Sequence, residues 1–367
     1  MIFQFAFYIL MFLFPFFMKG EGDVSAQIID NSPSDIFLSE PSFNKAFIKE
    51  NKIKFIKANI VNKPDGKIIH DQGLFRMYEF DTDGNIIKYF YNVITATEKI
   101  ETQVPPIYRR RRIIRKGYTK VDFQYKYDTL VTNFFYTSTG HLQMKRSMIG
   151  EFFNACYYEY YADGNIKKQT VCKETNSSID KKEFRLSVQT ILSQEKFEYV
   201  YQSPNQKRKK CLNDEGKIYK EGILNFAKGK LTDESYEFTV AWLRISTNYK
   251  YDNAGCLVEK IISDNTSGQR EDKWIFEYDS AYVESAKNTT SLQQIDELFD
   301  KRDNERGNVV KEIFFRNGIQ INEIIFLYDK IPSSAQDGKM VMMLTSQVTR
   351  QIQKQSITIV KYEYGFY

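Results

Sequence analysis

The residues of this chain that could do chemistry by type and spacing are acids, arginines and cysteines. The acids are frequent enough to supply the two carboxylates that glycoside hydrolysis needs. They lie in turn-like stretches, where Asp is favoured because its side chain bonds nearby backbone. The sequence contains no Gly-x-Ser-x-Gly, no His-Glu-x-x-His and no phosphate-binding glycine loop. We therefore expect no enzymatic activity, and a carbohydrate-active enzyme remains the alternative. The acids concerned are Asp81, Asp83, Asp163, Asp252 and Asp279.

The densest cluster of charge lies between Tyr108 and Tyr118. Clustered guanidinium groups bind phosphates and carboxylates, so the cluster predicts a polyanion site for lipopolysaccharide phosphates or acidic glycan. The alternative is a solvated loop or edge strand that like charge guards against pairing. The run 207–210 is interpreted in the same way, as a solvated segment. The candidate binding residues are Arg109, Arg110, Arg111, Arg112, Arg115 and Lys116.

Four cysteines in an exported chain suggest disulfides. Cys156 and Cys172 each lie eight residues from Gly164, so a hairpin centred on that glycine would place them opposite one another. Cys211 and Cys256 would then pair across neighbouring strands. The alternative is four buried thiols. We expect no metal site and no cofactor, because the sequence has no Cys-x-x-Cys spacing and only two histidines.

The N-terminus indicates export. Residues 2–18 are mostly apolar and lead to Val24-Ser25-Ala26, a small-x-small cleavage pattern. We predict a signal peptide over residues 1–26 and a mature chain from Gln27, located in the periplasm, at the cell surface or secreted. No Lys or Arg precedes the apolar run, so a retained anchor is the alternative.

A recurring phrase dominates the remaining sequence: two aromatic residues one position apart, then turn residues, then Gly, then Ile or Leu. Aromatics at i and i+2 share one face of a strand. Asp, Asn and Gly after them favour a tight turn, and Gly tolerates the positive φ that such a turn requires. Each copy therefore predicts a strand, a turn and a returning strand. The turn glycines are Gly84, Gly140, Gly164 and Gly255.

This phrase resembles the YD repeat, also called the RHS repeat, of bacterial secreted and cell-surface proteins. The best matches are Tyr249-Lys-Tyr251-Asp252-Asn-Ala-Gly255-Cys-Leu257 and Tyr78-Glu-Phe80-Asp81-Thr-Asp83-Gly84-Asn-Ile86. The spacing between glycines is irregular, and the chain is too short for a toxin-enclosing shell. The resemblance implies an extracytoplasmic β-sheet protein whose motif has no enzymatic role.

The expected fold is mainly β: an antiparallel meander of repeated hairpins, as an extended sheet or partly closed barrel, with one short helix. The clearest helix candidate is Ser291–Arg302, and a shorter helical turn begins at Pro41. The composition, 42% hydrophobic and 15% aromatic residues, is sufficient for a folded core. We expect one domain over residues 27–367, with a possible subdivision near 174–182.

The sequence favours a non-enzymatic exported cell-envelope binding or scaffold protein. The partner would be envelope polysaccharide or another envelope protein; the net charge of +5 predicts no nucleic acid. An outer-membrane β-barrel is the alternative, because the last strand alternates up to an aromatic C-terminus. Charges on both faces of strands, as at 217–221, oppose it. The alternating residues are Thr358, Val360, Tyr362, Tyr364 and Phe366.

Overall fold

The computed structural model describes most of the chain after residue 26. The described ranges are 27–36, 38–64, 69–109, 112–149, 152–176, 186–239, 241–253, 255–265, 270–279, 307–332 and 340–367. The predicted signal peptide (1–26), the predicted helix Ser291–Arg302, and Arg110 and Arg111 lie outside these residues.

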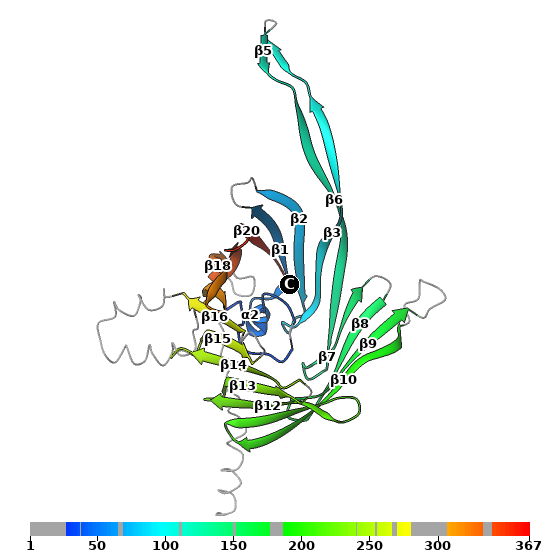
Figure 1. Ribbon diagram of the computed structural model, residues 1–367, viewed down its shortest axis with the longest axis vertical. Helices are drawn as coiled ribbons and strands as arrows, with labels where there is room; N and C mark the ends of the chain where they lie inside the picture. The colour runs from blue at the N-terminus through cyan, green and yellow to red at the C-terminus, as the bar shows by residue number, and fades with distance from the viewer. Residues whose placement is uncertain are drawn as a thin grey trace, which may run out of the picture.

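Eighteen strands form one antiparallel sheet that closes on itself (Figure 1). Each strand pairs with the strands before and after it in the ring, and the first strand pairs with the last from Ile53↔Phe366 to Pro64↔Ser356. The strands of the barrel are β1 Ile53–Pro64, β2 His70–Phe80, β3 Ile86–Val104, β6 Tyr118–Tyr136, β7 Leu142–Ile149, β8 Phe152–Tyr160, β9 Ile166–Asn176, β10 Leu186–Ser203, β11 Gln206–Leu212, β12 Ile218–Ala227, β13 Lys230–Phe238, β14 Leu243–Tyr251, β15 Leu257–Asp264, β16 Glu271–Tyr278, β17 Val309–Arg316, β18 Ile319–Pro332, β19 Met340–Gln351 and β20 Ser356–Phe366.

The expected fold class is confirmed: the chain is a meander of antiparallel hairpins, and the barrel is fully closed. This architecture agrees better with the β-barrel alternative than with an open scaffold of stacked hairpins. β9 and β10, on either side of the subdivision expected near 174–182, are paired neighbours, since Asn176 lies opposite Leu186. The described residues on both sides of that point therefore belong to one sheet.

Tight turns at one end of the barrel follow the repeated phrase. Gly84, Gly140, Gly164 and Gly255 have φ values of 80°, 82°, 83° and 78°, the conformations that the turn prediction requires. In the first turn the Asp81 carboxylate accepts hydrogen bonds from the backbone N–H groups of Asp83, at 2.9 Å, and Asn85, at 2.8 Å. This is the local backbone bonding that explains the turn acids without catalysis. We call this end, where β1 also begins and β20 finishes, the turn end.

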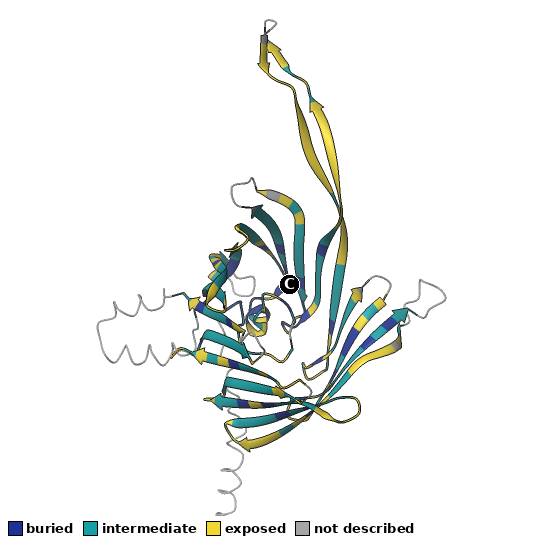
Figure 2. Cartoon of the chain, in the orientation of Figure 1, coloured by how far each residue is buried: buried dark blue, intermediate teal, exposed yellow. Residues whose placement is uncertain are grey.

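The core of the molecule lies inside the barrel. Strand residues alternate between the two faces of a sheet. The two aromatic residues of the repeated phrase, such as Tyr78 and Phe80, therefore share one face, and that face points inward. Tyr78 and Ile56 of the wall are fully buried against Ile28, Phe47 and Ile48, which precede the first strand. Figure 2 shows that the wall is largely of intermediate burial. The buried apolar side chains thus lie inside the barrel, while other large apolar side chains of the strands, such as Phe135, Ile325 and Leu327, are exposed.

The described residues before β1 lie in the lumen, and we call 27–36 and 38–52 the N-terminal segment. Among these residues the helix is α2, Lys45–Glu50, within the ring of strands in Figure 1. Asn44 caps this helix by accepting hydrogen bonds from the N–H groups of Ala46 and Phe47. The prediction of a helical turn from Pro41 was therefore wrong by four residues, because the cap is Asn44 and not Ser39.

One hairpin extends far beyond the barrel. β3 pairs with β2 only as far as Tyr91, and β6 pairs with β7 only from Thr132. Beyond these points the two strands pair with each other up to Val104↔Tyr118, and two short strands, β4 Ile107–Arg109 and β5 Arg112–Arg115, continue the ribbon. We call residues 96–126 the arm; it projects from the end opposite to the turn end and is mostly exposed (Figures 1 and 2).

The predicted disulfides are wrong. All four cysteines are free and buried. Cys172 lies opposite Ala155 and Cys156 lies opposite Val171, so the two thiols are one position out of register and on opposite faces of the sheet. Tyr160 lies opposite Ile166, so the hairpin is centred on Asp163 and not on Gly164, and the register shift at Glu159/Tyr160 then places the two cysteines on opposite faces. Cys211 lies on β11 and Cys256 precedes β15, so three strands separate them.

Candidate functional site: the barrel lumen

The N-terminal segment crosses the lumen and is held at several points. Near its middle, the Glu40 carbonyl oxygen accepts a hydrogen bond from Tyr78 Oη, at 2.7 Å, and one from Arg76, at 3.3 Å. On the other side of the barrel, Asp35 forms an ion pair of 3.1 Å with the buried Lys209 of β11. The segment is thus anchored both to β2 and to a strand far away around the ring, and it crosses the lumen.

A cavity of about 720 Å³ lies between the N-terminal segment and the wall. Its lining combines aromatic rings with amide and hydroxyl groups and only a few charges. This size and this mixture are typical of sites for small ligands. The wall contributes, among other residues, Tyr249, Lys260, Trp274, Glu312, Gln347 and Tyr362. A second cavity, of about 420 Å³, shares Asp30, Glu234 and Tyr249 with it and extends toward Lys207 and Lys230.

Lysines on the inner face of β11 to β15 lie over aromatic rings. The ammonium nitrogens of Lys207 and Lys260 are 4.8 Å and 5.4 Å from the ring centres of Tyr199 and Trp274. Such contacts stabilise a cation inside a protein by about 0.5–2 kcal/mol. The same arrangement recurs at Lys209, Lys220 and Lys230.

The interpretation of residues 207–210 as a solvated run was wrong for Lys207 and Lys209. Lys207 and Lys209 face the lumen, whereas Arg208 faces outward and forms an ion pair of 2.9 Å with Glu221. Alternation along a strand explains this split, because neighbouring side chains point to opposite faces. A run of like charges on a strand therefore divides between both faces of the sheet.

Burial changes the ionisation of two groups at the larger cavity. Burial, together with the charge of Glu40, raises the pKa of Glu312 to about 7, against a smaller opposing effect of Lys260. Burial likewise lowers the pKa of Lys260. Nearby, Tyr249 donates a hydrogen bond of 2.8 Å to Glu234. Perturbed groups in a cavity mark a candidate functional site.

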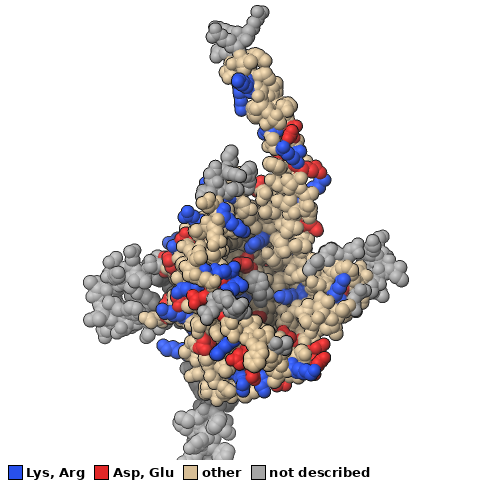
Figure 3. Space-filling view, in the orientation of Figure 1, with Lys and Arg blue, Asp and Glu red and all other residues tan. Residues whose placement is uncertain are grey.

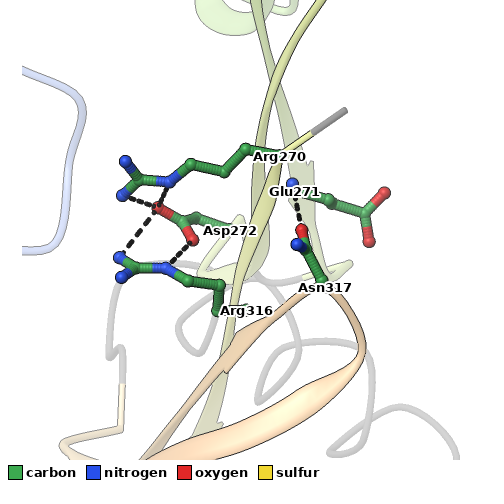
Figure 4. A network of polar contacts seen from close by, with 5 residues as sticks. All are labelled: Arg270, Glu271, Asp272, Arg316 and Asn317. Carbon is green, nitrogen blue, oxygen red and sulfur yellow. Dashed lines mark hydrogen bonds and ion pairs between the residues drawn. The ribbon is translucent and has the colours of Figure 1, made fainter. Parts of the chain in front are cut away.

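A polar clamp joins β16 to β17 (Figure 4). Asp272, largely buried, accepts hydrogen bonds from Arg270, at 2.9 Å, and from Arg316, at 2.8 Å. Beside them the side-chain oxygen of Asn317 accepts the backbone N–H of Glu271. Although burial favours the neutral acid, the hydrogen bonds from the two arginines lower the pKa of Asp272. The clamp therefore holds a carboxylate at the end of the barrel from which the arm projects.

The outer face of the barrel carries cross-strand ion pairs, and basic and acidic side chains intermingle over it (Figure 3). These residues alternate with the lumen-facing ones, as Lys273 does with Trp274. Pairs of this kind lie around the ring: Lys57–Glu363 at 3.7 Å, Arg208–Glu221 at 2.9 Å, Glu259–Lys273 at 2.6 Å and Lys311–Glu323 at 2.8 Å. A Lys or Arg on a lipid-facing strand costs roughly 2–4 kcal/mol at mid-membrane.

The last strand does not present its aromatic side chains as the sequence suggested. Thr358, Val360 and Tyr362 line the larger cavity. Tyr364 donates a hydrogen bond to the carbonyl of Leu344. In an outer-membrane barrel the alternating apolar residues face lipid. Here they face the lumen, so this pattern supports a barrel but not its lipid contact.

The predicted polyanion residues do not meet the lumen. Arg109 and Arg112 lie in β4 and β5 at the far end of the arm, and Arg115 and Lys116 follow them. The guanidinium of Arg115 is 4.8 Å from the ring centre of Tyr118. The sequence placed these residues on a sheet edge or loop, and the structure places them on a projecting hairpin.

The lumen residues were missed because they are dispersed over several strands. The sequence pattern that could have revealed them is the alternation of side chains along a strand. Lys207 and Lys209 share one face of the sheet with their cross-strand partners Tyr201 and Tyr199. Among the described residues, no group of His, Cys, Asp or Glu is arranged to hold a metal ion. No helix in the described ranges is long and apolar enough to cross a membrane.

No protein-family model matches this chain, and no curated protein matches it. It is similar to a porin-like protein from Bacteroides uniformis, with 10% identity, a TM-score of 0.35 and coverage of 85% of this chain and 98% of that one. It is also similar to a porin-like protein from Bacteroides vulgatus, with 9% identity, a TM-score of 0.30 and the same coverages. At these TM-scores neither likeness informs function.

Proposed function

We propose that this protein is a non-enzymatic β-barrel of the cell envelope that holds a small ligand in a closed lumen. The observation that carries the proposal is the N-terminal segment, anchored to β2 and β11, with the 720 Å³ cavity beside it. A barrel filled in this way is a chamber and not an open channel. The export of the chain is supported by the apolar residues 2–18 and the Val24-Ser25-Ala26 site.

The lining of the chamber suits a ligand that is polar at its edges and apolar on its faces. Trp274 and Tyr249 supply aromatic surfaces, and Gln347 supplies an amide. The charges at the cavity include both signs, among them Lys260 and Glu234, so a strongly charged ligand gains little there. Short oligosaccharides, as fragments of envelope polysaccharide, have this chemistry.

Native mass spectrometry of the protein from its native host tests ligand binding directly. We expect a bound mass, lost on denaturation, of a size that a cavity of a few hundred Å³ accommodates. A Trp242→Phe variant leaves Trp274 as the sole tryptophan, because the chain has two. Its emission should then change saturably with malto-, cello- or chito-oligosaccharides. The proposal would be contradicted if native mass spectrometry showed only the mass of the apoprotein and the tryptophan emission of the variant did not change with any of the three oligosaccharide series.

We propose that water, and not lipid, surrounds the outer face of the barrel. The ion pairs on its outer face, such as Glu259–Lys273 and Lys311–Glu323, are spread around the ring and would be costly in lipid. The inward aromatic side chains of β20 support the same setting. Osmotic shock should release the protein from cells without detergent.

An outer-membrane barrel is the second candidate, and topology favours it. The strand number is even, the first strand pairs with the last, and the long arm leaves one end of the barrel. Recovery only from detergent-extracted membranes, in cells where a periplasmic marker is released, would support this candidate and reject the water-surrounded barrel.

A further inference from the structure

The far end of the arm exposes a group of large apolar side chains. Ile107 and Tyr108 of β4 are 52% and 60% exposed, and Ile113 and Ile114 of β5 are 55% and 61% exposed. Single apolar residues are normal on a protein surface, but four large ones exposed on one short projecting hairpin are a candidate interaction site. We call the described residues 107–109 and 112–118 the tip; Tyr118, 42% exposed, is its last residue.

Positive charge is concentrated in the tip and absent, in net terms, from the rest of the arm. The sequence from Ile107 to Tyr118 contains six basic residues and no acid. The charged residues nearer to the barrel are instead balanced, because each lysine has a carboxylate partner. The partners are Lys126–Glu98 at 2.6 Å, Lys99–Glu101 at 2.5 Å and Lys120–Asp122 at 2.8 Å.

The arm holds the tip away from the barrel. Nine residues of β3, from Ala96 to Val104, run in the arm, and at ~3.3 Å per residue this places the tip roughly 30 Å beyond the barrel rim. Within this length β3 and β6 are paired only with each other among the described residues. The tip can therefore meet a surface that the barrel itself does not touch (Figure 1).

We propose that the tip docks onto an anionic lipid bilayer and tethers the barrel to it. Apolar side chains that enter the headgroup region, next to basic side chains that attract anionic lipid, are the two contributions that make a peripheral membrane contact. Tyrosines such as Tyr108 and Tyr118 suit the interface, because their rings are apolar and their hydroxyls polar. A soluble polyanion would match the charge but leave the isoleucines in water. A second copy of the tip would cover the isoleucines but bring like charges together.

Vesicle flotation with the purified full chain tests this proposal. The two probes are vesicles of phosphatidylcholine alone and vesicles that also contain phosphatidylglycerol. We expect binding to the anionic vesicles that weakens at high salt, and at least about tenfold weaker binding to the neutral vesicles. The variants Ile113→Ser/Ile114→Ser and Arg115→Ser/Lys116→Ser should each reduce binding to anionic vesicles by about tenfold.

A matched control lies in the same arm. Val121 and Phe123 of β6 are also exposed, at 41% and 51%, but they lie outside the tip. Val121→Ser/Phe123→Ser should leave vesicle binding within about twofold of wild type, since it removes apolar surface at the wrong place. Melting temperatures of all variants, and the ligand mass in the lumen, should stay close to those of the wild type because the arm does not contact the cavity.

Three results would overturn the proposal. Equal binding of wild type to neutral and anionic vesicles would show that charge has no part. Unchanged binding of the Ile113→Ser/Ile114→Ser variant, with dextran sulfate bound as strongly as vesicles, would assign the tip to soluble polyanions. Dimers that this variant dissociates, with no vesicle binding by the wild type, would assign it to a second copy of the chain.

Discussion

Tyr328 of β18 donates a hydrogen bond of 2.7 Å from its hydroxyl to the carbonyl oxygen of Val309, at the start of β17. The same relationship recurs along the barrel. In each case the tyrosine lies near the turn end of one strand and bonds the first or second residue of the preceding strand of the ring. Other examples are Tyr136 to Ile86, Tyr160 to Leu142, Tyr251 to Leu231 and Tyr278 to Leu257. The second aromatic of the repeated phrase thus fastens one hairpin to the preceding one.

Removing one such hydroxyl should destabilise the barrel measurably. In Tyr328→Phe the buried Val309 carbonyl loses its side-chain donor while the ring stays in place. We expect a loss of about 1 kcal/mol in the free energy of unfolding, measured by urea denaturation. Tyr125→Phe, in the exposed arm, is the control and should change stability by less than about 0.5 kcal/mol. Equal effects of both would show that the hydrogen bond contributes nothing.

Gly84 should tolerate alanine less well than Gly216. Both have positive φ, 80° and 78°, so alanine strains either backbone by about 1 kcal/mol. A Cβ on Gly84 would also lie 2.3 Å from the carbonyl oxygen of Lys45 in α2, whereas a Cβ on Gly216 meets no described atom within 4 Å. Gly84→Ala should therefore lower the melting temperature clearly more than Gly216→Ala. Equal shifts would contradict the close approach of α2 to this turn.

The contact between Asp35 and Lys209 should keep the N-terminal segment in the lumen. Asp35→Asn leaves the ammonium of the buried Lys209 without its carboxylate partner. Hydrogen exchange of amides 28–40 should then become faster while exchange in β17 and β18 stays slow. Asp83→Asn is the control, since its ion pair with Lys49 is exposed on both sides. Unchanged exchange in Asp35→Asn would mean that other contacts hold the segment.

Glu312 should make stability depend on pH. Its pKa is raised from 4.5 to about 7 in the folded protein. A raised carboxyl pKa contributes stability that is complete below the unfolded-state value and is lost as pH rises through the folded value. Wild type should therefore lose up to about 3 kcal/mol between pH 4.5 and 7, relative to Glu312→Gln. Parallel stability curves for the two proteins over this range would reject the shift.

The cysteines should react as buried thiols. Burial raises the pKa of Cys156 and Cys211, which lowers the thiolate fraction at neutral pH. We expect iodoacetamide to label the folded protein slowly and to modify four thiols after unfolding without reductant. Fewer than four labelled thiols under those conditions would reveal a disulfide that the structure lacks.

The repeated phrase was sufficient to predict the meander and its turns, because aromatic pairing and Asp or Gly turn chemistry act over a few residues. It was not sufficient to predict closure. That depends on the pairing of Ile53 with Phe366, at opposite ends of the chain, which no local pattern encodes. The disulfide prediction failed for a related reason: one shifted residue at Glu159/Tyr160 moves a thiol to the other face.

The lumen was hidden from sequence-based prediction because its residues come from many strands. Lys260 lies opposite Trp274 across β15 and β16, and Glu312 lies on the next strand, β17. The register of these three strands, which no single stretch of sequence shows, brings the residues to one cavity. The YD-repeat resemblance stays a prediction. The arginine cluster was correctly noticed as unusual, but the length of the hairpin that carries it follows from the pairing of β3 with β6.

The pairing of β1 with β20 has a consequence for synthesis on the ribosome. Asn59 and its hydrogen-bond partner Glu363 are separated by 304 positions, so the last contact of the ring awaits nearly the whole chain. Until then the sheet of a nascent chain has two unpaired edge strands, and exposed edge strands pair readily with other chains. Contacts of this sequence separation also slow folding. The two edges of this sheet therefore stay open during synthesis for longer than those of a protein built from local contacts.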